Sequence, residues 1–306
     1  MESNVVNYHV PALLEESVSL LDIRPDGVYA DATFGGGGHS REILKHLGPE
    51  GKLFGFDRDR DAIQNIPDDP RFTFVLSDFR FMRNWLKFYG CEKIDGIIAD
   101  LGVSFHHFDS PERGFSFRAD APLDMRMNSA GSLSAREVIN ESDEAQLKDI
   151  FKTHTDLRGV AEIARLISAA KREKPIETTL ELVEAVRPAL DPRNIKKDLA
   201  QVFQAVRIVT NNEMESLKSL LAQSEKVLKK NGVLAVLTYH SGEDRLVKDF
   251  FKTGNVNGEV EEDPIFGGKK SPWKLINKTP IKASEQEISL NPRSRSAKLR
   301  AAILKK

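Results

Sequence analysis

A short apolar strand that runs into four consecutive glycines is the feature that most restricts how this chain can fold. Residues 29–39 read Tyr-Ala-Asp-Ala-Thr-Phe-Gly-Gly-Gly-Gly-His. Glycines cost backbone entropy and bury little surface, so a folded protein keeps such a run where a ligand must approach the backbone closely. An amphipathic stretch from Ser40 to Leu47 follows directly. A strand, a glycine loop and a helix N-terminus in this order are typical of a nucleotide-binding crossover, and a plain glycine-rich turn is the alternative.

The composition is that of a globular protein with a substantial core. The chain has 306 residues, of which 40% are hydrophobic and 30% charged, enough for one large domain or two smaller ones. Its single cysteine, Cys91, excludes an internal disulfide and a cysteine-based zinc site, and we expect no metal. No apolar run reaches the roughly 20 residues of a membrane helix. Residues 1–4 also lack the character of a signal peptide, so we expect a cytoplasmic protein without membrane contact.

The charge of the chain gives no overall attraction to nucleic acid. The formal net charge is −1, so any polyanion must bind a local basic surface. One candidate is the segment from Asn291 to the C-terminus, which includes Arg293 and Arg295 and contains no acidic residue. On charge alone, a solvated basic strand explains this segment equally well.

Short apolar runs alternate with amphipathic stretches in the first hundred residues. Buried parallel strands are continuously apolar, whereas the helices between them repeat with the helical period. The alternation favours an α/β fold with a doubly wound parallel sheet. The expected strands are residues 28–34, 52–56, 72–76 and 94–99, and the expected helices are residues 13–21, 40–47 and 59–66.

After about residue 110 the pattern becomes helical, and we interpret this region as an all-helical insertion. Val160, Ile163, Ala164 and Ile167 recur at the spacing of one helical face. The α/β pattern resumes further on, where the last two stretches are expected to form a closing antiparallel pair. The expected helices are residues 137–140, 145–152, 160–171, 180–186 and 217–228, followed by a strand over 232–239 and the closing stretches 273–282 and 296–304.

The residues around the glycine loop narrow the choice of cofactor. A triphosphate-binding loop needs a Lys-Ser/Thr pair after its glycines, whereas His39 and Ser40 stand there. Asp57 ends the second strand about twenty residues past the glycines, where a carboxylate can accept from both ribose hydroxyls. That position fits NAD and S-adenosylmethionine equally.

Acidic and aromatic residues at the next strand ends favour S-adenosylmethionine. Asp78 and Phe79 follow the third strand, and Asp100 ends the fourth. Phe79 is suited to stack on an adenine, Asp78 to accept from its amino group, and Asp100 to lie near the sulfonium. Each acid alone is more often a helix cap, but a row of them suits a cationic ligand and repels a pyrophosphate.

The chain resembles the bacterial small-subunit ribosomal RNA cytosine-N4 methyltransferases over nearly its full length. Many separated motifs match in the right order, which is far more specific than a glycine loop. They are residues 9–11 and 13–14 (His-Val-Pro, Leu-Leu), 31–40 (Asp-Ala-Thr-Phe-Gly-Gly-Gly-Gly-His-Ser), 57–59 (Asp-Arg-Asp), 95–104 (Asp-Gly-Ile-Ile-Ala-Asp-Leu-Gly-Val-Ser), 113–117 (Arg-Gly-Phe-Ser-Phe), 122–127 (Pro-Leu-Asp-Met-Arg-Met), 203–208 (Phe-Gln-Ala-Val-Arg-Ile), 240–241 with 243–245 (His-Ser, Glu-Asp-Arg) and 291–296 (Asn-Pro-Arg-Ser-Arg-Ser).

The resemblance implies methylation of the N4 amine of one cytosine in 16S rRNA near the P site of the small ribosomal subunit. It implies an α/β fold, a Rossmann-like class I methyltransferase sheet with an inserted all-helical domain. On this chain the methyltransferase domain would comprise residues 1–112 and 200–306, and the insertion, a candidate for substrate recognition, residues 113–199. A homodimer is left open. The family's cofactor contacts fall on Gly37, Gly38, His39, Asp57, Phe79 and Asp100.

The chain departs from the family pattern at two places. The family usually has Ser-Pro-Gln where this chain has residues 105–107, Phe-His-His. His107 occupies the place of a cofactor-contacting glutamine, and we keep it as a cofactor candidate because histidine also donates or accepts hydrogen bonds. Gly242 replaces the usual leucine, and glycine in a helix costs about 1 kcal/mol relative to alanine.

Asp100 and Asp124 are the candidates for holding the cytosine amine. The reaction needs the amine aligned with the sulfonium and an acceptor for an amine hydrogen, and alignment alone supplies several kcal/mol. Asp100 serves equally well as a cofactor ligand alone. For Asp124 we slightly favour a structural pairing with Arg126.

Other residues near these motifs have plainer interpretations that we favour. Phe115 and Phe117 can stack on an extruded base, but alternating aromatics more often belong to a core. His240 is better explained as a hydrogen-bonded loop histidine, and a metal pair of His106 and His107 lacks further ligands.

Basic residues outside the pocket are expected to bind the RNA. The candidates are Arg113, Arg118 and Arg126, with Arg293 and Arg295 near the C-terminus.

Two other functions compete with rRNA methylation. The alternatives are a methyltransferase for a small molecule or protein and a nicotinamide-dependent oxidoreductase.

Overall fold

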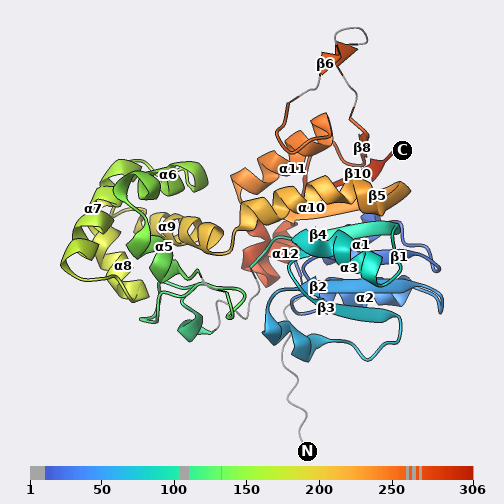
Figure 1. Ribbon diagram of the computed structural model, residues 1–306, viewed down its shortest axis with the longest axis horizontal. Helices are drawn as coiled ribbons and strands as arrows, with labels where there is room; N and C mark the ends of the chain where they lie inside the picture. Colours follow the sequence, from blue (N-terminus) through green and yellow to red (C-terminus); the bar gives the residue numbers. More distant parts are fainter. Residues whose placement is uncertain are drawn as a thin grey trace, which may run out of the picture. The chain divides into compact units, whose positions relative to one another are not determined.

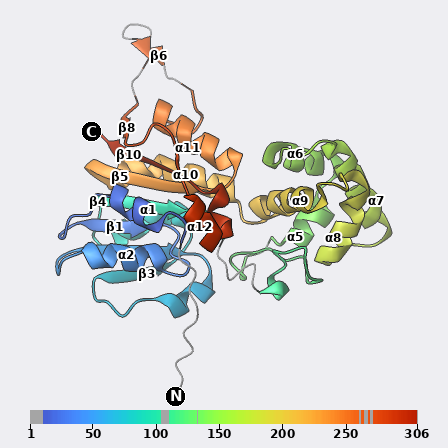
Figure 2. The ribbon, with the colours of Figure 1, turned by 180° about the vertical axis from the view of Figure 1, so that it is seen from behind.

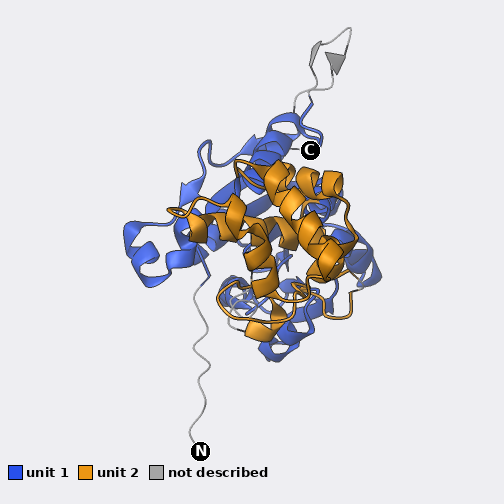
Figure 3. Cartoon of the chain, turned by 90° about the vertical axis from the view of Figure 1, so that its left-hand side faces the viewer, with its two compact units in different colours: residues 1–102, 215–306 blue, residues 103–214 orange. Residues whose placement is uncertain are grey.

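The chain is described by a computed structural model that covers residues 11–103, 110–131, 133–259, 262–263, 267–268 and 271–305. It forms two compact units (Figure 3). Unit 1 consists of residues 1–102 and 215–306, and unit 2 of residues 103–214. The predicted insertion, residues 113–199, lies inside unit 2, which is wider at both ends. It extends past residue 199 because helix α9 (Ile195–Thr210) packs its apolar face among the other helices of this unit.

Unit 1 is built on an eight-stranded sheet within the described residues. The strand order is β3-β2-β1-β4-β5-β10-β8, and β9 also pairs with β10. The first five strands run parallel, whereas β10 is antiparallel to its three partners. The strands are β1 Val28–Asp31, β2 Lys52–Asp57, β3 Phe72–Leu76, β4 Ile94–Asp100, β5 Leu228–Thr238, β8 Trp273–Leu275, β9 Ile281–Lys282 and β10 Lys298–Leu304.

Helices cover both faces of this sheet (Figures 1 and 2). One face carries α1 (Leu14–Leu20) and α2 (Gly38–His46), and the other carries α3 (Met82–Phe88), α10 (Glu213–Val227) and α11 (Ser241–Thr253). The remaining elements of unit 1 are the helix α12 Glu285–Leu290, the 3-10 helices η1 Arg60–Asn65, η2 Phe79–Phe81 and η5 Pro292–Ser296, and the paired short strands β6 Glu262–Asp263 and β7 Gly267–Gly268.

Alternate residues of each central strand enter the two cores. In β5, Leu234 and Val236 pack with α10 and α11, whereas Val233, Ala235 and Leu237 pack on the side of α1 and α2. Both sets of side chains are therefore apolar, which is the property of a strand buried on both faces. The predicted doubly wound α/β sheet is confirmed.

The expected elements differ from the observed ones at their ends, and helices α3, α9, α11 and α12 are missing from the ranges expected from the sequence. The strand expected over 28–34 ends at Asp31, where the chain turns into the glycine loop. The helix expected over 59–66 is the 3-10 helix η1, and Asp59 caps it by accepting from the Asp61 N–H. The expected closing strands pair antiparallel through β10, as predicted.

The described part of unit 2 is helical, as predicted. Three helices begin with a capping box, in which the first side chain and the residue three positions on satisfy each other's backbone N–H groups. The helices are α5 Ala135–Glu141, α6 Glu144–His154, α7 Val160–Glu173, α8 Thr179–Val186 and α9, with the 3-10 helices η3 Pro111–Arg113 and η4 Arg187–Ala189.

Across the described ranges, no helix is both long enough and apolar enough to span a membrane.

Candidate active site

The glycine loop lies at the carboxyl edge of the unit 1 sheet, between β1 and α2. Gly37 caps α2 with a φ of 74°, a left-handed conformation that side chains rarely adopt. A Cβ on Gly37 would lie 2.9 Å from the Phe34 ring, and a Cβ on Gly38 would lie 2.3 Å from Pro11 Cγ. Both positions therefore require glycine, because neighbouring side chains occupy the space that a Cβ would fill.

Three side chains from other elements hold this loop in place. Asp57 at the end of β2 accepts from the Gly35 N–H at 2.7 Å, and Asn65 donates to the Gly35 carbonyl at 2.9 Å. Arg41 donates to the Gly36 carbonyl at 2.6 Å. Of these residues, only Asp57 was expected from the sequence. Asn65 is buried although it ends a surface 3-10 helix, a property that the sequence pattern did not reveal.

His39 and Asp31 form the buried base of the loop. Asp31 accepts from the Ser40 hydroxyl at 2.7 Å, and its burial raises the pKa of the carboxyl, against the lowering effect of His39. His39 is buried in the first turn of α2, and its Nε2 has no hydrogen-bond partner among the described residues. A buried polar atom of this kind needs a partner, and a bound ligand is one way to supply it.

The carboxylate of Asp57 is hydrogen-bonded within the protein through both of its oxygens. Its Oδ2 binds the Gly35 N–H, and its Oδ1 accepts from the Asp59 N–H at 2.8 Å. These bonds place the carboxylate beside the glycine loop at the end of β2. Its contact with ribose hydroxyls, and the contacts of Gly37, Gly38 and His39 with the cofactor, stay predictions.

Asp100 ends β4 and is fixed by groups from three segments. Its N–H donates to Thr33 Oγ1 at 2.7 Å, and its Oδ1 accepts from the Gly102 N–H at 2.9 Å. Its side chain is also hydrogen-bonded to the phenol of Tyr239, which follows β5. The segment from Thr33 to Gly35 therefore connects Asp100 with Asp57 at one edge of the sheet.

Tyr239 is a site residue that sequence analysis missed. Burial raises the pKa of its phenol well above the ordinary value near 10, and the charge of Asp100 adds to this effect. The phenol therefore stays protonated at neutral pH and donates to the carboxylate. The only signal in the sequence was its place at the end of the fifth expected strand, directly before His240.

Asp78 and Phe79 follow the end of β3. Asp78 caps η2 through the Arg80 N–H, and its Oδ2 accepts from Ser216 at 3.1 Å and Arg58 at 3.3 Å. Asp78 thus has the helix-capping role that a single acid most often has, and its contact with an adenine amino group stays a prediction. Phe79 is half-buried against the apolar core, and its stacking on adenine stays a prediction.

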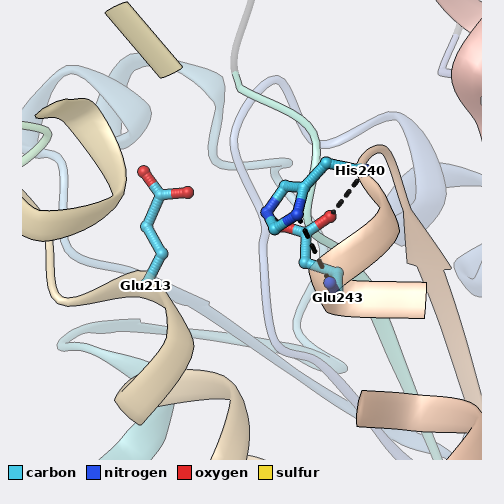
Figure 4. Close-up of side chains that lie close together, drawn as sticks. All are labelled: Glu213, His240 and Glu243. Carbon is cyan, nitrogen blue, oxygen red and sulfur yellow. Dashed lines mark hydrogen bonds and ion pairs between the residues drawn. The ribbon is translucent and has the colours of Figure 1, made fainter. Parts of the chain in front are cut away.

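His240 has the structural role that we favoured. It caps α11, where its Nδ1 accepts from the Glu243 N–H at 3.3 Å (Figure 4). Glu243 in turn accepts from the backbone N–H of Tyr239 at 2.8 Å and of His240 at 3.3 Å. Glu213, also drawn there, belongs to unit 2 and pairs with Arg207 at 2.8 Å. Gly242 lies within α11, so the helix forms despite the glycine.

In unit 2, the predicted pairing of Asp124 with Arg126 is confirmed. The guanidinium of Arg126 contacts both carboxylate oxygens at 2.5–3.1 Å. Burial acts to raise the pKa of Asp124, but the hydrogen bonds and charge of Arg126 outweigh it and leave the pKa below its usual value. These contacts are the ones a structural acid makes, and a catalytic role of Asp124 stays a prediction.

This pair contributes stability that depends on pH. Because the pKa of Asp124 is lower in the folded protein, its contribution is complete above the unfolded value of about 3.9 and is lost as the pH falls through the folded value. We expect Asp124→Asn to cost about 1 kcal/mol of unfolding free energy near neutral pH and progressively less on acidification. Urea unfolding at several pH values measures this, with the exposed Asp120→Asn as control. A cost independent of pH would contradict it.

The segment around Asp124 is held by Asn211, which sequence analysis missed. Met125 has a φ of 55°, an unusual conformation for a side chain of this size. The amide of Asn211 accepts from the Met127 N–H and donates to the Met125 carbonyl, both at 2.7 Å. The Arg113 guanidinium donates to the carbonyl of Arg126 at 2.9 Å.

Removing the Asn211 amide is therefore expected to destabilise unit 2. In Asn211→Ala a buried side chain is lost and the Met127 N–H is left without this acceptor, which costs roughly 2–4 kcal/mol of unfolding free energy. Chemical denaturation followed by circular dichroism measures the loss. The matched control is Asn212→Gly at the next position, which is exposed and has a φ of 50°, and which we expect to be nearly neutral. Equal effects of the two changes would contradict the assignment.

The remaining candidates fall into three groups. Phe115 is buried in the helical core, and Phe117 packs edge-on against Phe203 with ring centroids 5.5 Å apart, so the core interpretation is confirmed. Arg118, Arg293 and Arg295 are exposed, and their RNA contacts stay predictions. His106 and His107 lie outside the described residues.

Comparison with known proteins identifies the family. A sequence model of the MraW methylase family matches residues 6–305. The chain belongs to the MraW methylase family. It is 51% identical over 303 residues to the Ribosomal RNA small subunit methyltransferase H of Parabacteroides distasonis, covering 99% of each chain. The proteins of the same name from Bacteroides thetaiotaomicron (51%, 99% of each chain) and Christiangramia forsetii (50%, 97% of this chain and 98% of that one) are similar over nearly their whole lengths.

Membership of the MraW methylase family confirms the resemblance drawn from the motifs. The chain is a methyltransferase with a Rossmann-like fold, and S-adenosylmethionine is its cofactor, as the strand-end residues favoured. The nicotinamide-dependent alternative loses its support, because Asp57 suits both ligands and the family assignment decides between them.

Proposed function

We propose that this MraW-family protein methylates the N4 amine of one cytosine in 16S rRNA, near the P site of the small ribosomal subunit. The observation that carries the RNA substrate is the full-length, 51% identity to relatives named for the small-subunit ribosomal RNA. The base and the atom rest on the motif resemblance, together with the acidic strand end at Asp100.

Different site residues would contact different parts of the cofactor. Bound S-adenosylmethionine supplies an electrophilic methyl group on a sulfonium. The backbone of Gly37 and Gly38 and the Nε2 atom of His39 would contact its amino-acid end, Asp57 its ribose hydroxyls and Phe79 its adenine. His107 keeps its place as a further candidate contact.

Asp100 would orient the cytosine amine and accept one of its hydrogens. Cytosine N4 is a weak nucleophile because its lone pair is delocalised into the ring, so alignment contributes much of the rate. The hydrogen bonds from Gly102 and Tyr239 fix the Asp100 carboxylate before substrate arrives, so little ordering is left to the reaction step. Asp124 is the second candidate for this task.

The proposed rRNA substrate also implies which parts of the protein bind RNA and where in the cell the protein acts. Unit 2 would recognise the RNA, with the exposed Arg118 among its basic contacts and Arg293 and Arg295 contributing from unit 1. The substrate implies a cytoplasmic location and the small subunit as partner. A homodimer is compatible with this scheme.

Product analysis tests the proposal. The protein is incubated with isotope-labelled S-adenosylmethionine and small ribosomal subunits that lack the modification, and the RNA is digested for nucleoside mass spectrometry. We expect labelled N4-methylcytidine at one position. Label in another nucleoside, or none in RNA, would overturn the proposal, and label in added protein would favour the alternative of a protein substrate.

A further inference from the structure

The helix α3 and the short 3-10 helix before it carry an aromatic surface that the proposed site does not use. The side chains of Phe81, Tyr89 and Phe88 are 46%, 42% and 74% exposed. Large aromatic side chains are usually mostly buried, and contiguous exposed apolar surface commonly marks a site of interaction. Figure 1 shows α3 on the outside of unit 1, over the face of the sheet that also carries α10.

The aromatic side chains form a row along the helix. Phe81, Trp85 and Phe88 are spaced i, i+4 and i+7, which places them on one helical face. The rings also touch: the centroids of Trp85 and Phe88 are 5.8 Å apart, and those of Phe88 and Tyr89 are 5.2 Å apart, both edge-to-face. These contacts hold the exposed rings in place, so the surface exists before any partner binds.

A row of cations lies beside the aromatic row. Arg80, Arg83 and Lys87 are exposed and spaced i, i+3 and i+7, next to the aromatic positions on the helix. The Arg80 guanidinium lies 4.8 Å above the Phe81 ring. From Phe79 to Cys91 the sequence contains no acidic residue. Asp78, just before this stretch, lies 4.0 Å from the Arg80 guanidinium and offsets its charge, so the positive charge of the surface comes mainly from Arg83 and Lys87.

The surface begins at the edge of the cofactor site. Phe79, the predicted partner of the adenine, is only two residues from Phe81, and both belong to η2 at the carboxyl end of β3. A ligand that reaches the methyl group at this edge can therefore continue along α3.

We propose that the surface made by Arg80, Phe81, Arg83, Trp85, Lys87 and Phe88 binds a single-stranded segment of the RNA substrate. Bases would stack on the rings of Phe81 and Phe88, and phosphates would pair with Arg83 and Lys87. Stacking on aromatic side chains beside a cationic track is how proteins bind single strands without reading their sequence. Aromatic residues and arginine also suit a protein interface, but the exposed cations Arg83 and Lys87 beside the rings favour a polyanion. The inference rests on the proposed rRNA substrate and adds a contact to it.

Direct binding measurements test the aromatic row. The probe is a fluorescein-labelled oligouridine of about twelve nucleotides, within the range that single-strand sites cover. We expect Phe88→Ala to weaken binding about tenfold and Phe81→Ala with Phe88→Ala to weaken it more, whereas Phe88→Tyr keeps the affinity. Leu290→Ala is the matched control, because Leu290 is 81% exposed on α12 of the same unit. Unchanged S-adenosylmethionine binding by calorimetry shows that each variant is folded.

Two further readouts separate stacking from charge. Changing Arg83 and Lys87 to alanine should reduce the slope of log affinity against log salt by about 1.4, since each single-strand phosphate contact contributes about 0.7. The chain has two tryptophans, and Trp273 is buried, so quenching of tryptophan fluorescence by oligouridine reports on Trp85.

The outcomes distinguish this inference from the proposed function. If the wild-type protein forms N4-methylcytidine but the alanine variants bind oligouridine and methylate subunits as it does, the RNA surface is wrong and the function stands. If the variants only break up a dimer in sedimentation, with RNA affinity unchanged, the surface is a protein interface instead. If the wild type makes no N4-methylcytidine, the proposed function fails, and the loss or retention of oligouridine binding still decides on the surface.

Discussion

An Asp57→Ala protein is expected to bind S-adenosylmethionine at least about 100-fold more weakly than the wild type. The change removes the expected acceptor of the ribose hydroxyls, and each hydrogen bond to a charged group contributes about 1.5–3 kcal/mol. Since about 1.4 kcal/mol corresponds to a tenfold change, two such bonds account for the loss. The change also frees the Gly35 N–H, which Asp57 binds at 2.7 Å, so the glycine loop loses one of its three anchors.

Calorimetric titration with S-adenosylmethionine measures this effect, and two variants make it specific. Asp57→Asn keeps an acceptor oxygen but loses the charge, so we expect an intermediate affinity. Asp68→Ala removes an exposed carboxylate from the segment before β3 and should bind like the wild type. Wild-type affinity in Asp57→Ala would show that the cofactor does not use this residue.

An Asp100→Asn protein is expected to methylate RNA about 100-fold or more slowly. Asparagine has nearly the same shape, so the contacts from Gly102 and Tyr239 to a side-chain oxygen can persist while the negative charge is lost. General acid–base groups contribute about 100-fold to 10,000-fold to rates. The expected loss therefore reflects the chemistry of the carboxylate and not a collapse of the site.

Comparison of the rate with cofactor affinity separates the two roles left open for Asp100. If it holds the cytosine amine, the maximal rate falls and S-adenosylmethionine binding changes little. If it is only a cofactor ligand, the affinity falls and saturating cofactor restores the rate. Glu92→Gln, an exposed acid just before β4, serves as control. Full activity of Asp100→Asn at low cofactor concentration would remove it from both roles.

The tertiary contacts changed the interpretation of several acids that looked alike in the sequence. Asp57, Asp78 and Asp100 all stand at strand ends. Asp78 is bound by Ser216, 138 positions away, and by Arg58, which gives it a structural role. Strand-end position predicts where a carboxylate lies, but its role depends on which donors the fold brings beside it.

The sequence by itself determined the strands of the parallel sheet and the place of the glycine loop in unit 1, because these depend on short-range patterns of apolar and glycine residues. Only the tertiary structure decided which distant side chains hold the glycine loop, Asp100 and the segment around Met125. Asn65 reaches Gly35, Tyr239 reaches Asp100 and Asn211 reaches Met125, over separations of 30 to 139 positions. The physical reason is that hydrogen bonds between distant segments depend on how the whole chain packs, which no local pattern encodes.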